Sequence, residues 1–294
     1  MTDRIQLSRS EYLDLPGARI HVRHWGKPDA PTLFMLHGWM DCSITFQFLV
    51  DAFVHQWHVI APDWRGFGLS QWQNRPYMFI DYSVDLAALL DQYSPDTPVR
   101  LLGHSMGGNV AAVFSGLFPE RIARLALLEN FGAPAYPRDG LRDRLAHWIR
   151  ETRQGPPPLR TYANLESYAE RLRHGNHRLT PERAHFLAQH FSRRDEQGLI
   201  TAAADPWHRA ASPRLLNVDD FRGLWRHIEA PTLFVAGQES TFFRRFDSDP
   251  KSYADHRASF RRLSEVVLSE AGHNVQHDQP EQLASILEAF FLGG

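Results

Sequence analysis

Short apolar runs, each closed by glycine, proline or polar residues, recur along this chain and alternate with segments of helical spacing such as Asp81–Tyr93. Continuous runs of this length are typical of strands that are buried on both faces. The alternation predicts a mostly parallel sheet flanked by helices. Its predicted strands are Thr32–His37, His58–Pro62, Val99–Leu102, Arg124–Leu128, Pro231–Ala236 and Glu265–Leu268.

A different pattern marks the beginning of the chain. Glu11–Leu15 and Arg19–Trp25 alternate apolar with polar residues on either side of Pro16-Gly17. This is typical of an antiparallel hairpin with one solvated face. The hairpin is expected at the edge of the sheet and brings the predicted number of strands to eight.

One long segment interrupts the alternation. Residues 133–227 have helical patterns, are rich in arginine and histidine, and contain no convincing buried strand. The segment is too long for a simple crossover between two strands. We therefore expect a helical cap, 133–227, inserted after the sixth strand of a core formed by residues 1–132 and 228–294.

Composition narrows the class of protein. The 294 residues are 43% hydrophobic and 22% charged, with a formal net charge of −2, so there is no electrostatic case for binding nucleic acid or an anionic membrane. Cys42 is the only cysteine, which excludes an internal disulfide and suits a reducing compartment. The polar segment Met1–Ser10 lacks an apolar signal core, and no run is long enough to span a bilayer. We expect a cytoplasmic protein, whose oligomeric state the sequence does not indicate.

The candidate chemistry centres on Gly103-His104-Ser105-Met106-Gly107, which lies between an apolar strand and a helix of small residues. Strand, tight turn and helix form the context in which Gly-x-Ser-x-Gly indicates a nucleophile elbow. Glycine removes the Cβ atoms that would collide where the strand folds back into the helix. A glycine-rich turn with an incidental serine is the alternative, and the surrounding sequence has to decide between them.

Four local patterns follow one another along the chain: His37-Gly38-Trp39, Asp63–Ser70, Gly103–Gly107, and Gly272-His273 with His277 and Pro280 behind it. In this order they resemble the α/β-hydrolase superfamily, in its serine hydrolase form with a helical cap. More loosely, His37–Asp41 and Leu172–Thr180 are similar to a subgroup called serine-hydrolase-like proteins.

The resemblance implies that Ser105 is the nucleophile and that His273 is the base that removes its proton. His37, His104 and His277 lie in the same loops, and structural hydrogen bonds suit them better.

The resemblance also implies an oxyanion hole. Its backbone N–H groups would come from Met106, directly after the nucleophile, and from Trp39 in the loop after the third strand.

The resemblance further implies an acidic residue that orients the base, and here the sequence departs from the family's usual pattern. Ser240 occupies the position after the seventh strand where the family usually has an aspartate. Glu129 follows the sixth strand, which is the other known location, and we favour it as the acid. Glu239 is the alternative, and Asp247 or no acid at all also remain open.

A serine nucleophile implies an acyl-enzyme, whereas the epoxide hydrolases and haloalkane dehalogenases of this fold use an aspartate. The sequence therefore predicts hydrolysis of small to medium carboxylic esters, with a small-molecule acyl compound as substrate. Lactones, thioesters and activated C–C bonds are alternatives on the same residues. A ligand-binding protein without turnover is an alternative from another class. No metal-ligand cluster and no dinucleotide or phosphate-binding motif is visible, so no cofactor is expected.

Overall fold

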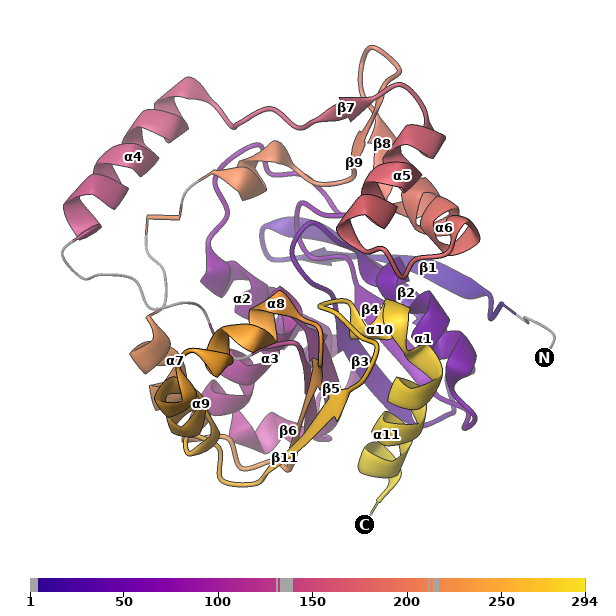
Figure 1. Ribbon diagram of the computed structural model, residues 1–294, viewed down its shortest axis with the longest axis vertical. Helices are drawn as coiled ribbons and strands as arrows, with labels where there is room; N and C mark the ends of the chain where they lie inside the picture. The colour runs from indigo at the N-terminus through magenta and orange to yellow at the C-terminus, as the bar shows by residue number, and fades with distance from the viewer. Residues whose placement is uncertain (1–4, 131, 133–139, 211, 214–216, 294) are drawn as a thin grey trace.

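The computed structural model describes residues 5–130, 132, 140–210, 212–213 and 217–293. An eight-stranded sheet runs through it (Figure 1), and β2 alone runs against its neighbours. The predicted mostly parallel sheet of eight strands is confirmed. In spatial order the strands are β1 (Ser8–Leu15), β2 (Ala18–Trp25), β4 (His58–Pro62), β3 (Thr32–Leu36), β5 (Val99–His104), β6 (Ile122–Leu128), β10 (Thr232–Gly237) and β11 (Leu263–Leu268).

Burial explains why these segments are strands. Every residue of β4 and β10 is buried, as the continuous apolar runs predict for central parallel strands. β1, at the edge, alternates between exposed and half-buried residues and pairs with β2 in antiparallel register, from Ser8 opposite Trp25 to Leu15 opposite Ala18. Gly17 turns the hairpin with a positive φ of 83°, which glycine adopts without steric cost. The predicted edge hairpin is therefore confirmed.

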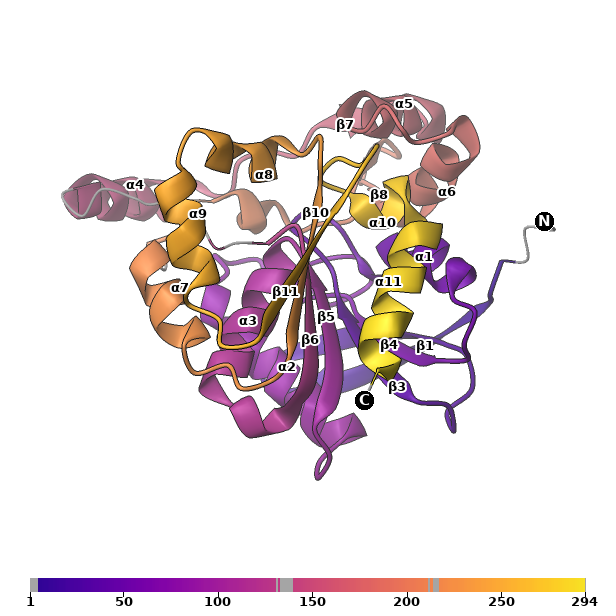
Figure 2. The same ribbon diagram turned by 60° about the horizontal axis from the view of Figure 1, so that its bottom comes forward.

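Helices cover both faces of the sheet (Figure 2). One face carries α2, α3 and α7, which also contact one another, and the opposite face carries α1 and α11. The helices of the main body are α1 (Gln47–Ala52), α2 (Phe79–Tyr93), α3 (Met106–Leu117), α7 (Val218–Trp225), α8 (Thr241–Arg244), α9 (Pro250–Arg257), α10 (Val275–Asp278) and α11 (Pro280–Leu292).

The segment between β6 and β10 contains α4 (Leu141–Gln154), α5 (Leu165–Gly175) and α6 (Pro181–Phe191). It also contains a small antiparallel sheet, so the expectation that it has no buried strand is wrong. The sheet has the order β7 (Thr161–Tyr162), β9 (Ile200–Ala202) and β8 (Ser192–Arg194). Strands of two or three residues carry no hydrophobic period that a sequence pattern could reveal.

We refer to the described residues of this segment from 140 to 213 as the insertion, because α7, which comes later in the segment, packs against α3 of the main body. The first residues of the predicted cap, 133–139, lie outside the described residues, and the division of the chain into core and cap stays a prediction. Strand β9 leads into the contact that joins the insertion to the loop after β4. Gly68 N donates to Ala203 O at 2.7 Å, and the ring of His208 lies between Phe67 and Tyr77, with centroids 3.7 and 3.8 Å away.

None of the helices in the described ranges combines the length and apolar character that a bilayer crossing requires.

A buried ion pair holds the loop after β4 against α2. Arg65 donates to Asp85 through Nε at 2.7 Å and through Nη2 at 2.5 Å, and both side chains are almost fully buried. Asp85→Ala would leave the guanidinium buried without this partner, and we expect the free energy of unfolding to fall by about 3 kcal/mol. Urea unfolding followed by circular dichroism measures this change.

Asp91→Ala is the matched control, because Asp91 pairs with Arg121 at 2.8 Å but is mostly exposed. This substitution should lower the free energy of unfolding by less than about 1 kcal/mol. A loss of similar size in both variants would contradict the account of the Arg65–Asp85 pair.

Candidate active site

The turn between β5 and α3 projects the side chain of Ser105 out of the sheet. Ser105 has φ 51° and ψ −114°, a region that residues other than glycine rarely adopt. A Cβ atom on Gly103 would lie 2.5 Å from Gly107 O, and one on Gly107 would lie 2.3 Å from Leu36 O. Only glycine fits at either position, so the spacing in the sequence has a steric cause. The strained serine is held by its own N–H, which donates to Leu128 O at 2.9 Å.

Three side chains from distant parts of the chain meet at this turn. Ser105 Oγ lies 3.0 Å from His273 Nε2, and His273 Nδ1 lies 3.1 Å from Glu129 Oε2. Ser105 follows β5, Glu129 follows β6, and His273 lies in the loop between β11 and α10. Because parallel strands end at the same edge of the sheet, residues 144 and 168 positions apart come into contact.

Glu129 is fully buried, with 0% of its surface exposed, and its carboxylate accepts hydrogen bonds from three groups. Gly237 N donates to Oε1 at 2.5 Å, and Ser240 Oγ donates to Oε2 at 2.5 Å. The His273 ring approaches the same Oε2 atom. Ser240, which stands where the family pattern has an aspartate, thus supplies a donor to a carboxylate on the neighbouring strand. The sequence did not reveal this role.

The other two candidate acids lie elsewhere. Glu239 forms an ion pair with Arg178 of the insertion and is about half exposed. Asp247 is mostly exposed and lies 3.7 Å from Arg244. The structure brings Glu129, and neither of these carboxylates, into hydrogen-bond distance of His273.

Two buried histidines support the loop that carries His273. His104 Nε2 donates to the backbone oxygen of His273 at 2.8 Å, and burial lowers the pKa of His104 well below its usual range. His277 Nε2 and Thr45 Oγ1 lie 2.8 Å apart, and burial lowers the pKa of His277 to about 4. Both rings are therefore neutral near pH 7. They hold the loop through hydrogen bonds and do not serve as further bases.

The loop His37-Gly38-Trp39 lies beside Ser105, since a Cβ atom on Gly38 would be 3.4 Å from that of Ser105. Burial lowers the pKa of His37 to about 4. Because Trp64 N donates to His37 Nε2 at 2.9 Å, the ring proton is on Nδ1, which donates to Gly38 O at 2.7 Å. In a trans peptide the C=O and the following N–H point in opposite directions. The N–H of Trp39 is therefore directed away from the His37 ring.

The second backbone N–H predicted for an oxyanion hole belongs to Met106, the first residue of α3. The first N–H groups of a helix have no partner within the helix. The side chain of Trp39 is more than half exposed, and its indole N–H donates to His208 O of the insertion at 3.3 Å.

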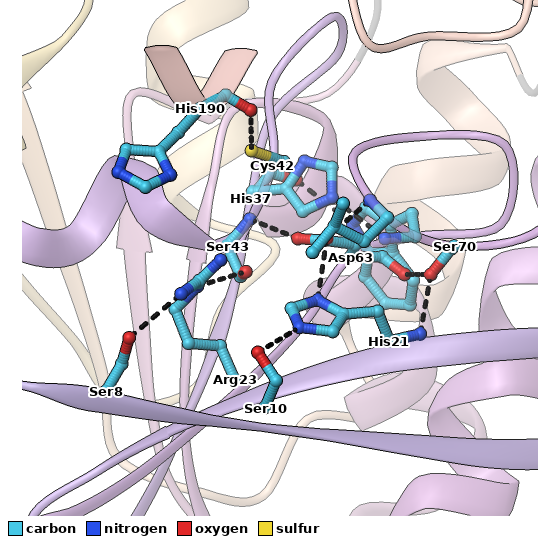
Figure 3. A network of polar contacts seen from close by, with 12 residues as sticks. Ser8, Ser10, His21, Arg23, His37, Cys42, Ser43, Asp63, Ser70 and His190 are labelled. Atoms are coloured by element: carbon cyan, nitrogen blue, oxygen red, sulfur yellow. Dashed lines mark hydrogen bonds and ion pairs between the residues drawn. The ribbon is translucent and has the colours of Figure 1, made fainter. Parts of the chain in front are cut away.

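Beneath this loop a buried carboxylate organises a polar network (Figure 3). Asp63 accepts hydrogen bonds from His21 Nδ1 at 2.8 Å, Ser43 N at 2.7 Å and Leu69 N at 2.9 Å. Burial alone would raise the pKa of Asp63, but the hydrogen bond and charge of His21 lower it overall, so the group is ionised. The network connects β2, the segment that follows Trp39, and the loop after β4. It gives the motif Asp63–Ser70 a supporting function.

A cavity of about 470 Å³ opens over Ser105 and His273. Its floor includes Gly38 and Trp39, and its walls come mostly from the insertion. A volume of this size suits a small to medium organic molecule. The apolar lining residues that the insertion contributes are Leu159, Tyr162, Tyr168, Leu172, Leu179, Leu187, Phe191 and Ala202.

No group of three or more histidine, cysteine, aspartate or glutamate side chains that could hold a metal ion occurs in the part of the chain that the structure describes.

Fold and site together define a hydrolase-type α/β protein with a serine at the strand–helix turn. A family model described as the alpha/beta hydrolase fold matches residues 31–280. The chain belongs to the α/β-hydrolase fold family.

Individual relatives agree with this assignment. A serine hydrolase-like protein of Danio rerio is 26% identical over 309 aligned residues, covering 98% of this chain and 90% of the relative. Epoxide hydrolase A of Mycobacterium tuberculosis is 25% identical, covering 96% of each chain. The solved thioesterase domain from the curacin biosynthetic pathway superposes with a TM-score of 0.85 at 23% identity, covering 96% of this chain and 99% of that domain, and so shares the fold. These similarities support a hydrolase.

Asp41 is a further carboxyl group that lines the cavity, and the sequence did not single it out. Although part of its surface is exposed, desolvation raises its pKa from 3.8 to about 7. Between these values the unfolded chain loses a proton that the folded chain keeps, so the free energy of unfolding decreases as the pH rises and levels off above about 7. Urea titrations between pH 4.5 and 8 should show this decrease relative to Asp41→Asn.

The matched control is Asp96→Asn, which changes an exposed loop carboxyl. The stability difference between wild type and this control should vary much less with pH. If the difference between wild type and Asp41→Asn is constant across the range, the raised pKa is wrong.

Proposed function

We propose that this protein is a serine hydrolase that cleaves carboxylic esters of small to medium size through an acyl-enzyme. The observation that carries the proposal is the chain of two contacts, Ser105 Oγ to His273 Nε2 and His273 Nδ1 to Glu129 Oε2. A serine hydroxyl is a weak nucleophile at neutral pH and needs such a base. The proposal also takes the cavity above Ser105 as the space for the acyl compound.

In the first half of the reaction, Ser105 Oγ attacks the ester carbonyl while its proton passes to His273 Nε2. The oxygen that becomes negative would accept hydrogen bonds from the backbone N–H groups of Trp39 and Met106. Collapse of this intermediate breaks the C–O bond of the ester. The leaving alcohol takes the proton from His273, and the acyl group stays on Ser105.

In the second half, His273 removes a proton from a water molecule, whose oxygen attacks the acyl carbonyl. The bond to Ser105 Oγ breaks, Ser105 recovers the proton from His273, and the carboxylic acid leaves. Glu129 keeps the proton of the neutral ring on Nδ1 and stabilises the imidazolium that forms in each half. Glu129 does not itself need to take a proton.

Serine at the turn also argues against epoxide hydrolysis, although Epoxide hydrolase A is among the relatives. That reaction on this fold uses an aspartate that forms an alkyl ester, and position 105 is a serine.

A fluorophosphonate probe tests whether Ser105 is an activated nucleophile. We expect labelling of the folded wild type and none of Ser105→Ala, because only a hydroxyl with a base reacts at a useful rate. His273→Gln should reduce the rate of labelling at least about a hundredfold. Intact-mass spectrometry and gel fluorescence measure both.

Heat-denatured wild type serves as the control for non-specific reaction. Equal labelling of wild type and Ser105→Ala would contradict the assignment of the nucleophile. No labelling of either would favour a ligand-binding protein without turnover.

Glu129→Gln tests the acid against Glu239→Gln as its matched control. A glutamine amide N–H facing His273 Nδ1 would donate to it and leave the ring proton on Nε2, where the ring cannot accept from Ser105. We expect kcat for 4-nitrophenyl butyrate to fall by about 10³ to 10⁴. Glu239→Gln should stay within about threefold of wild type, because Glu239 pairs with Arg178 away from the ring. Small and equal effects of the two changes would refute the assignment of Glu129.

A further inference from the structure

The cavity above Ser105 carries a positive charge that the reaction described above does not use. Arg160, Arg171 and Arg209 all line it, and they come from three different stretches of the insertion. Arg160 directly precedes β7, Arg171 lies in α5, and Arg209 ends the 3-10 helix η4 (Pro206–Arg209). Three guanidinium groups around one opening are a strong local charge for a chain whose net charge is −2.

These three arginines differ from others nearby. Arg178 pairs with Glu239 and Arg183 with Glu281, so arginines next to the cavity are matched by carboxylates. Among the residues that the structure describes, no carboxylate forms an ion pair with any of the three lining arginines.

Two of the three contact neutral groups instead. Arg209 Nη1 donates to Pro158 O at 2.7 Å, which holds it against the stretch that carries Arg160. The guanidinium of Arg160 lies 5.2 Å from the centre of the Tyr162 ring. Guanidinium groups held by neutral partners keep N–H donors free for an anion.

Asp41 is the one acidic residue among the described residues that line the cavity. Desolvation raises its pKa to about 7, so near neutral pH this carboxyl is ionised only in part. The lining therefore keeps a net positive charge. A cleft lined by one sign of charge concentrates ligands of the opposite sign.

Exposure places the charge at the outer end of the cavity. Arg160, Arg171 and Arg209 are exposed, whereas Leu179 and Leu187 are buried in its wall. An apolar part of a ligand would lie along this wall, and an anionic part would remain at the mouth. The arrangement suits an amphipathic ligand with a charged outer end.

We propose that Arg160, Arg171 and Arg209 form the anion-binding mouth of this cavity and select acyl substrates whose outer end carries a carboxylate or a phosphate. The inference rests on the proposed function, because it takes Ser105 as the group that attacks the acyl carbon. The anion has two sources, a second carboxylate on the acyl chain or a phosphate on the leaving alcohol.

Two anionic esters, each with a neutral reference of similar size, separate these sources. The first is the mono-4-nitrophenyl ester of hexanedioic acid, compared with 4-nitrophenyl hexanoate. The second is phenyl hexanoate with a phosphate at the para position of the ring, compared with the para-methoxy ester. We expect kcat/KM to favour an anionic ester over its neutral reference by about tenfold or more at low salt, with the preference falling as salt screens the charges. The ester that shows it identifies the source.

Variants connect the preference to the arginines. Each of Arg160→Gln, Arg171→Gln and Arg209→Gln should reduce the anionic-to-neutral ratio of kcat/KM by about threefold, as exposed ion pairs do, and the triple variant should abolish the preference. Arg153→Gln is the matched control, because Arg153 is an exposed arginine of α4 that does not line the cavity. Equal rates for anionic and neutral esters in wild type, or an equal loss of preference in the control, would overturn the proposal.

Binding to a catalytically inactive chain separates this proposal from the proposed function. Titration calorimetry of Ser105→Ala with monohexyl hexanedioate and with hexyl phosphate should show binding that the triple arginine change removes. Binding of this kind without ester hydrolysis by wild type would refute the proposed hydrolase but keep the anion site. No arginine-dependent binding of either compound would overturn the anion site even if esters are hydrolysed.

Discussion

A carboxylate with no exposed surface is stable only if donors from the protein replace the water it has lost. At Glu129 these donors are Gly237 N, Ser240 Oγ and the ring of His273, and they belong to two segments, one at the end of β10 and one after β11. Without them the buried charge would cost several kcal/mol. The same contacts fix the plane of the imidazole and direct its second nitrogen at Ser105. The contacts that stabilise the buried carboxylate are therefore also those that position the imidazole beside Ser105.

The surrounding loops extend this constraint to the other side of Ser105. His37 holds the Gly38 carbonyl, and the buried Asp63 holds the segment that follows Trp39, so the backbone beside the serine cannot rotate freely. His104 holds the backbone of His273 from beneath. Pre-organised dipoles of this kind are worth more in a dry site than mobile ones, because they need not reorient as charge develops. The insertion then adds an apolar wall and a charged mouth above a rigid floor.

Much of this architecture could be predicted from the sequence, and the failures have physical causes. Buried parallel strands leave continuous apolar runs, and the strand–helix turn at Ser105 needs glycines. Both features can therefore be recognised in short stretches of the sequence. The sequence could not decide whether Glu129 or Glu239 is the carboxylate beside His273. Each follows a strand, and only the three-dimensional arrangement shows which of the two lies near the ring. The small sheet of the insertion was missed because its strands are two or three residues long. The arginine mouth depends on side-chain directions that no local pattern encodes.

The position of one proton tests the central claim most directly. In protein labelled with ¹⁵N-histidine, at a pH where the ring is neutral, the resonances of His273 can be assigned by comparison with His273→Gln. If Glu129 orients the ring towards Ser105, Nδ1 carries the proton and Nε2 does not, and Glu129→Gln reverses this distribution. A proton on Nε2 in the wild type, or a distribution that Glu129→Gln leaves unchanged, would contradict the account.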